Sequence, residues 1–362
     1  MNQIMQLHGA CWSGDWEQVK SLVKQGVDVN AQGFEWHTPL HLAAQKGNVD
    51  AVKFLLENGA DINKVTQYQK RTPLFLAAVK YQIEAAKTLV NAGSDINQTD
   101  GQGWTPLHWL VAESSIIDTA KFKNFLSELK PDINQEDCFK KTPLHCAVSS
   151  KNSEAVRVLL EFGADINKMD DHEKTPLDYA VSRQDWSSLQ AILDYGGDVN
   201  KTDCDGKTLL ERALENQDSR CINVLLEYGA NVNYVNDKGQ MPLHMAVNNK
   251  DIKSLALLLQ AGVDVNKVDS DGKTPLRRAV ELNDMVKVSL LLVSGADKTI
   301  ADNNGKTPLD IAEQMMKENL LFERDKSRDI ILLLTSRVAT SCPIKVASHT
   351  QTIQNQNVNI RS

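Results

Sequence analysis

Residues 37–48, His-Thr-Pro-Leu-His-Leu-Ala-Ala-Gln-Lys-Gly-Asn, contain a core that returns along the whole chain at an almost constant interval. The first residue of each copy, which is Thr except for one Met, stands at positions 38, 72, 105, 142, 175, 208, 241, 274 and 307. A second marker, Asp-Val/Ile-Asn or a close variant, keeps the same phase and ends at Asn30, Asn63, Asn97, Asn134, Asn167, Asn200, Asn233 and Asn266. Two markers with one period of about 33 residues indicate a tandem repeat.

One repeat predicts two helices. Thr38 is a good N-cap, and Pro39 suits a first helical turn, where the missing N–H has no partner to lose. Gly47-Asn48 then ends this helix, and apolar residues at helical spacing over 49–57 predict a second one. Gly59 provides the left-handed residue that ends the second helix.

A two-helix unit of this length cannot fold alone. Ordering the backbone costs about 1 to 2 kcal/mol for each residue, and two short helices bury too little apolar surface to offset that cost. The units must therefore stack on one another. The sequence predicts an all-α solenoid of stacked helix-turn-helix units with protruding turns.

The period and the Thr-Pro-Leu-His-x-Ala signature resemble those of the ankyrin-repeat family. The resemblance extends over nearly the whole chain and implies about ten repeats. Residues 1–33 are expected to form an N-terminal capping repeat that lacks Thr-Pro, and residues 34–301 to form repeats two to nine. Residues 302–337 should form a C-terminal capping repeat with a lengthened connection, and the polar residues 338–362 a disordered tail.

The recurring histidines raise the question of chemistry. The fourth position of the core holds His in five repeats, but Phe75, Asp178, Glu211, Arg278 and Asp310 replace it in the others. Equivalent residues of stacked helices lie about 8 to 10 Å apart, whereas zinc binds nitrogen at about 2 Å, so the rings cannot share a metal. The family resemblance implies instead that Thr and His tie the helix start to the turn and to the neighbouring repeat.

Composition and known motifs argue against several functions. The chain has 40 basic and 47 acidic residues, a net charge of -7, so clustered phosphate binding is not expected and no nucleic-acid partner is predicted. The six cysteines are scattered and indicate reduced thiols rather than a zinc site. No apolar stretch approaches the roughly 20 residues of a membrane span, and the N-terminus lacks a secretory pattern. With no phosphate loop or catalytic motif present, we expect no enzyme, cofactor or metal, and a cytoplasmic monomer.

Binding to another protein is the predicted function, through the concave face and the turn tips. Aromatic residues gather at such positions in repeats one to five and not beyond, and exposed aromatic residues are typical of binding hot spots. For Trp36, Trp104 and Trp109, packing between neighbouring turns is the alternative. The predicted partner-binding residues are Trp12, Phe34, Glu35, Trp36, Gln45, Lys46, Tyr68, Arg71, Trp104, Trp109 and Phe139.

Three other hypotheses remain open. The chain is compatible with a client-recognition adaptor of a ubiquitin ligase, although no SOCS-box or F-box-like segment follows Leu334. It is also compatible with a translocated bacterial effector that binds host proteins, which would place it in the host cytosol; the nucleus is a further alternative location. Finally, Asn63 and Asn167 resemble the ankyrin asparagines that are hydroxylated in animal cells.

Overall fold

The computed structural model describes residues 2–33, 36–113, 118–318 and 324–336. This part of the chain contains twenty helices and one isolated β-bridge, between Thr202 and Thr208. It divides into two compact units: the described residues up to 198, with 203–206, form an N-terminal unit, and the described residues of 199–202 and from 207 onward form a C-terminal unit. The predicted disordered tail, and the connection within the last repeat, lie outside the described residues.

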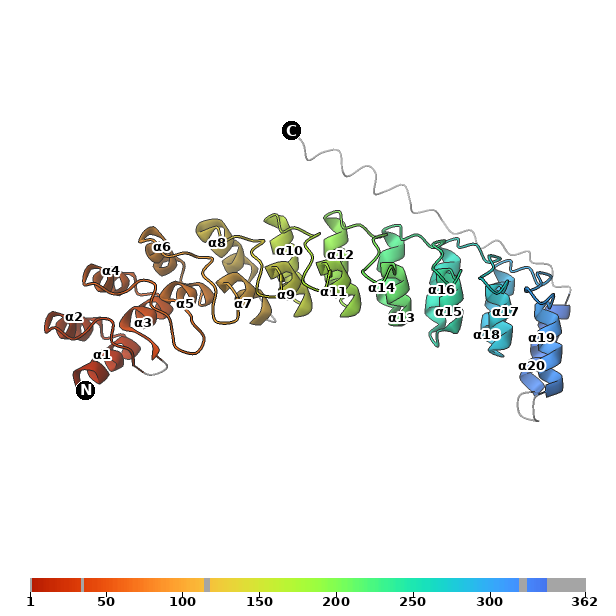
Figure 1. Cartoon of the computed structure of the whole chain (residues 1–362), viewed down its shortest axis with the longest axis horizontal. Coiled ribbons are helices and arrows are strands. Elements are labelled where there is room, and N and C mark those ends of the chain that lie inside the picture. The colour runs from red at the N-terminus through yellow and green to blue at the C-terminus, as the bar shows by residue number, and fades with distance from the viewer. Residues whose placement is uncertain (1, 34–35, 114–117, 319–323, 337–362) are drawn as a thin grey trace, which may run out of the picture. The chain divides into compact units, whose positions relative to one another are not determined.

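Within the N-terminal unit, helices of alternate number form two layers (Figure 1). Neighbouring odd-numbered helices pack on one another, and so do neighbouring even-numbered helices from α4 to α12. The odd-numbered helices are α1 Asn2–Ser13, α3 Pro39–Lys46, α5 Pro73–Val79, α7 Pro106–Glu113, α9 Pro143–Ser149 and α11 Pro176–Ser182. The even-numbered helices are α2 Trp16–Lys24, α4 Val49–Glu57, α6 Ile83–Asn91, α8 Thr119–Leu129, α10 Ser153–Glu161 and α12 Trp186–Asp194.

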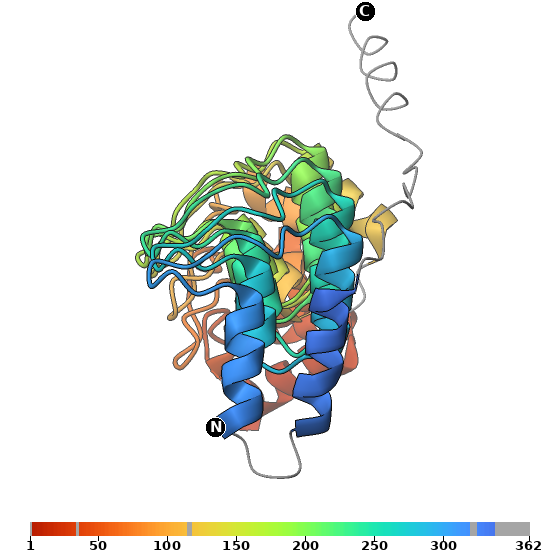
Figure 2. The ribbon, with the colours of Figure 1, turned by 90° about the vertical axis from the view of Figure 1, so that its right-hand side faces the viewer.

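The C-terminal unit repeats this arrangement. Its odd-numbered layer holds α13 Leu209–Glu215, α15 Pro242–Asn248, α17 Pro275–Glu281 and α19 Pro308–Glu318. Its even-numbered layer holds α14 Ser219–Glu227, α16 Ile252–Gln260, α18 Met285–Val293 and α20 Arg324–Thr335. Figure 2 shows that the turns before the odd-numbered helices of this unit project beyond the odd-numbered layer. The prediction of an all-α solenoid with protruding turns is confirmed.

The second repeat shows why these residues form these helices. Thr38 caps α3 by accepting a hydrogen bond from the third residue of the helix, and Pro39 occupies the first helical position. Gly47, with φ 75°, ends α3 in the left-handed conformation that suits glycine. Asn48 then caps α4 through its side chain, which accepts from the Ala51 N–H.

The apolar core lies between the two layers and between neighbouring repeats. In the second repeat Leu40 of α3 and Val52 and Leu55 of α4 are completely buried. Each such side chain stabilises the fold by about 1.5 to 3 kcal/mol relative to an exposed one. In repeat four, where the chain is longer, Phe122 and Phe125 of α8 are also completely buried. The largest fully buried side chains therefore belong to the helices rather than to the turn tips.

Candidate functional site

Where the repeated core contains a histidine, that residue joins its repeat to the next. In α3 the Thr38 backbone N–H donates to Nδ1 of His41 at 3.1 Å, and His41 Nε2 lies 3.1 Å from the carbonyl oxygen of Arg71. An amide N–H only donates and a carbonyl only accepts, so the ring carries its proton on Nε2. The neutral ring therefore satisfies both of these contacts.

The same bridge recurs at three other buried histidines. Nε2 of His108, His145 and His244 lies 3.0 to 3.1 Å from the carbonyl oxygens of Lys141, Lys174 and Lys273, respectively. Burial lowers the pKa of each ring, for His41 from 6.5 to about 4. These imidazoles are neutral structural groups near pH 7. The prediction that the motif histidines tie neighbouring repeats together is confirmed.

Buried aspartates hold the turn tips in shape. Asp100 Oδ1 accepts from the N–H groups of Gln102 and Trp104 at 2.9 and 3.1 Å. Asp137, 8% exposed, does the same for Phe139 and Lys141, both at 2.8 Å. An acceptor of this kind stands five residues before the core Thr or Met in repeats four to ten, as Asp or Asn. That regular spacing indicates that these residues shape turns, because Asp and Asn side chains readily bind the backbone two residues further along.

Trp104 holds the tip of the following repeat. Its indole Nε1 donates to Oδ2 of Asp137 at 3.2 Å, and its ring stacks near the His108 ring with 6.4 Å between the centroids. The side chain is half-buried. Trp104 therefore has a clear packing role, and we do not include it among the residues proposed to contact a partner.

Arg71 and Trp109 contact each other rather than standing free. The Arg71 guanidinium carbon lies 4.9 Å from the Phe75 ring centroid and 5.2 Å from that of Trp109. Its Nε lies 3.6 Å from Oδ2 of Asp100, and its side chain is only 14% exposed. Phe75 replaces the motif histidine in this repeat, and its ring packs against the cation instead. We therefore set Arg71 and Trp109 aside as structural residues.

Four predicted aromatic residues of the N-terminal unit are exposed: Trp12 (62%), Trp36 (43%), Tyr68 (81%) and Phe139 (55%). Trp12 lies late in α1, and the other three lie on the tips of repeats two, three and five.

Two neighbours from α3 complete this set. The Nζ of Lys46 sits 4.9 Å from the Trp12 ring centroid, and the adjacent Gln45 is half-buried. We call the surface formed by Trp12, Trp36, Gln45, Lys46, Tyr68 and Phe139 the tip surface. The predicted residues Phe34 and Glu35 lie outside the described residues.

The asparagines of the second marker link repeats along another edge. Asn30 Oδ1 accepts from the Asp61 N–H at 2.7 Å, and Asn134 Oδ1 accepts from the Asp165 N–H at 2.8 Å. Equivalent bonds are made by Asn97, Asn200, Asn233 and Asn266. Asn63 and Asn167 are exposed, and in the described part of the chain their side chains make no such bond.

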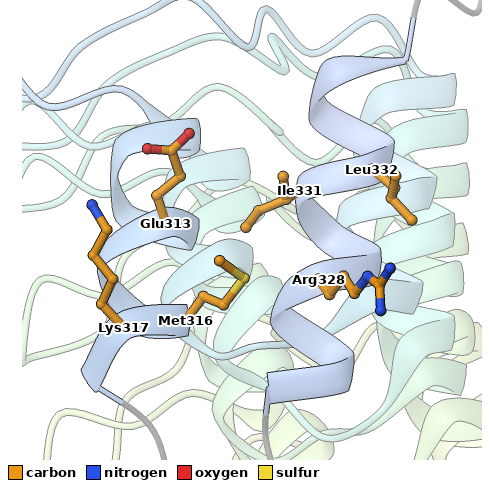
Figure 3. A pocket seen from close by; sticks show the side chains of 6 residues that line it. All are labelled: Glu313, Met316, Lys317, Arg328, Ile331 and Leu332. Atoms are coloured by element: carbon orange, nitrogen blue, oxygen red, sulfur yellow. The ribbon is translucent and has the colours of Figure 1, made fainter.

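Two hollows lie in the C-terminal unit. One, of about 380 Å³, lies between α19 and α20 where a further repeat would stack, with Met316, Ile331 and Leu332 as its apolar lining and Glu313, Lys317 and Arg328 around them (Figure 3). The other, of about 630 Å³, is polar and is lined by residues of the last two repeats, including Arg277 and Lys306. In the residues that the structure describes, no group of three or more His, Cys, Asp or Glu side chains is placed to hold a metal ion.

No helix in the described ranges is both long and apolar enough to cross a bilayer.

Comparisons with known proteins agree with this geometry. No curated protein sequence matches the chain significantly. Among solved structures, the chain is similar to the crystal structure of the ankyrin repeat domain of Bcl-3, described as a unique member of the IkappaB protein family. The identity is 28%, the match covers 63% of this chain and 99% of that one, and the TM-score is 0.52.

A family model describing ankyrin repeats, in three copies, matches residues 7–100, 93–170, 116–203, 184–269 and 243–322. Together these matches extend over most of the chain and cover the same residues as the repeated helix pairs. The chain therefore belongs to the ankyrin-repeat family.

Proposed function

We propose that this chain is a non-enzymatic scaffold or adaptor that binds a partner protein through the tip surface. Its repeats are of a kind that forms protein-interaction domains. The choice of surface rests on one observation. Trp12, Trp36, Tyr68 and Phe139 are exposed, and the apolar core forms without them. Exposed aromatic side chains of this size are typical centres of protein interfaces.

The test removes exposed rings that the fold does not use. The Trp12→Ala, Tyr68→Ala double variant should retain its thermal unfolding profile and lose at least about tenfold in affinity for the proteins that the full chain captures from a lysate of its native source. The matched control is Phe162→Ala with Tyr195→Ala, two exposed rings at the ends of even-numbered helices of the same unit. Equal capture by both double variants would contradict the proposal.

A second proposal concerns modification. We infer that Asn63 and Asn167 are the asparagines most open to hydroxylation, because they are exposed and lack the inter-repeat bond that holds their six counterparts. Intact-mass measurement after incubation with an asparaginyl hydroxylase tests this idea. Added oxygen should be lost in the Asn63→Ala, Asn167→Ala variant, and an unchanged mass of the original chain would rule the idea out.

A further inference from the structure

We propose that the tip surface, together with the lysines around it in repeats two to five, recognises an acidic segment of the partner protein. This inference rests on the proposed function and adds the chemistry of the partner. The segment should carry carboxylates spaced for the lysines and apolar or aromatic residues for the exposed rings.

The first observation is the balance of charge. The described tips and odd-numbered helices of repeats two to five expose Lys46, Lys70, Lys80 and Lys140. Glu113 is the exposed carboxylate of these odd-numbered helices. Asp61, Asp95 and Asp132 are also exposed, at the start of the turns, where each accepts from the backbone N–H two residues further along. Four exposed lysines thus lie around the tip surface in a chain whose net charge is -7.

The other carboxylates of these tips are already engaged. Asp100 and Asp137 are 8% exposed and hold their own turns through backbone N–H groups. Glu136 is partly exposed and pairs with Lys168 Nζ at 3.1 Å. None of these three acids is therefore placed to neutralise the exposed lysines.

The even-numbered helices of the same repeats show a different pattern. Lys87 of α6 pairs with Glu84, with 3.5 Å between Nζ and Oε1, and also with Glu128 of α8. Lys123 of α8 pairs with Glu161 of α10 at 2.6 Å. These two lysines are paired within and between repeats, whereas in the described residues no ion pair is found for Lys46, Lys70, Lys80 or Lys140.

Later repeats also compensate the lysine that precedes the core Thr. Lys207 pairs with Glu215 at 2.5 Å, and Lys273 pairs with Glu281 at 3.2 Å, in each case with an acid eight residues further along the chain. In repeat five the equivalent of that acid, eight residues after Lys141, is Ser149. Lys141 instead has its Nζ 5.1 Å from the centroid of the Tyr179 ring, so an aromatic ring rather than a carboxylate contacts it there.

The spacing of the lysines defines the ligand further. Lys46 and Lys80 each stand eight residues after the core Thr of adjacent repeats, and adjacent packed helices are about 8 to 10 Å apart. An extended chain advances about 3.3 Å for each residue, so carboxylates about three residues apart would match. Lys46 already lies over the Trp12 ring, which places a cation and an apolar face together.

A peptide fits these observations better than a nucleic acid. Nucleic-acid binding at physiological salt typically uses about 6 to 10 phosphate contacts, whereas this surface offers a few separated cations in an acidic chain. Exposed lysines around aromatic side chains give selectivity for an acidic, partly apolar peptide through complementary charge.

The experiment selects ligands without assuming a sequence. A random linear-peptide library displayed on phage is panned on the full chain at physiological ionic strength. We expect the recovered peptides to be enriched in Asp and Glu about three residues apart, with aromatic or large apolar residues between them. A labelled recovered peptide should bind about tenfold or more weakly to the Lys46→Glu, Lys80→Glu, Lys140→Glu variant in fluorescence anisotropy.

The matched control reverses three exposed charges on even-numbered helices, Lys24→Glu, Lys53→Glu and Arg157→Glu, and changes the net charge by the same amount. It should leave the affinity within about twofold. Recovered peptides without acidic enrichment, no enrichment at all, or equal loss in both triple variants would overturn the inference. Tighter binding of a short single-stranded oligonucleotide than of any recovered peptide would overturn it in favour of a nucleic acid.

The two proposals fail separately. If recovered peptides are not acidic but bind in a way that depends on Trp12 and Tyr68, the partner chemistry is wrong and the tip surface remains the binding surface. If acidic peptides bind the chain and neither Trp12→Ala nor Tyr68→Ala alters their affinity, the proposed surface itself is wrong.

Discussion

Trp104 of the fourth repeat donates its indole Nε1–H to the Oδ2 atom of Asp137 in the fifth, over 3.2 Å. The other oxygen of that carboxylate holds the backbone of its own tip. One tryptophan on a protruding turn thus fixes the shape of the next turn, so an aromatic residue at a tip is not by itself a binding residue. The four aromatic residues of the tip surface, Trp12, Trp36, Tyr68 and Phe139, have no such role in the fold.

The Trp104→Phe substitution should lower the free energy of unfolding by about 1 to 3 kcal/mol, because it leaves a buried carboxylate oxygen without its donor. Urea unfolding followed by circular dichroism measures the change. Tyr68→Ala, at a tip residue that is 81% exposed, is the control and should alter stability by about 0.5 kcal/mol or less. A Trp104→Phe protein as stable as the original would contradict this structural role of the indole.

Removing one histidine bridge should also weaken the stack. His41→Ala deletes the acceptor for the Thr38 N–H and the donor to the Arg71 carbonyl, and leaves a space beside α3. We expect a loss of about 2 to 4 kcal/mol in the free energy of unfolding, measured by the same urea titration. His172→Ala, at an exposed tip, should change stability little. If the two variants lose a similar amount of free energy of unfolding, the histidine bridge does not stabilise the fold.

The buried histidines predict that the fold weakens as pH falls. The pKa of His41 is lowered in the folded state to about 4 from 6.5, so between these values the unfolded chain binds more protons than the folded chain. The stabilisation is complete above pH 6.5 and is lost as pH falls towards 4, by up to about 3 kcal/mol for this ring. The lowered pKa values of His108, His145 and His244 act in the same direction.

Carboxylates also titrate near the lower end of this range, so the direct measurement follows the rings themselves. Titration of the histidine ring signals by NMR should show all four buried rings with a pKa below 6.5. A ring that titrates near 6.5 in the folded protein would contradict the assignment for that repeat.

The asparagine bridges offer a matched comparison. Asn134→Ala removes the acceptor of the Asp165 N–H and should destabilise the interface between repeats four and five by about 0.5 to 1.5 kcal/mol. Asn63→Ala removes an exposed side chain without that bond, and its effect should stay within about 0.5 kcal/mol. Amide hydrogen exchange at Asp165 reports the local loosening expected in Asn134→Ala, and unchanged exchange there would count against the bridge.

The sequence by itself determined the architecture of each repeat. Thr38, Pro39, Gly47 and Gly59 specify where helices begin and end through short-range sterics and capping, and the apolar spacing specifies which face is buried. These are local interactions that recur with the period, so a single chain without relatives suffices to identify them. The structural role of His41 followed from the same regularity.

Only the tertiary structure decided what each tip residue does. Trp104 and Tyr68 stand on neighbouring tips with the same kind of side chain, yet one reaches a carboxylate 33 residues away and the other meets solvent. Arg71 likewise is drawn between Phe75 and Trp109, a contact that joins two repeats. Such partners come from adjacent repeats and depend on the stacking distance and the rotamer, neither of which is encoded in the period.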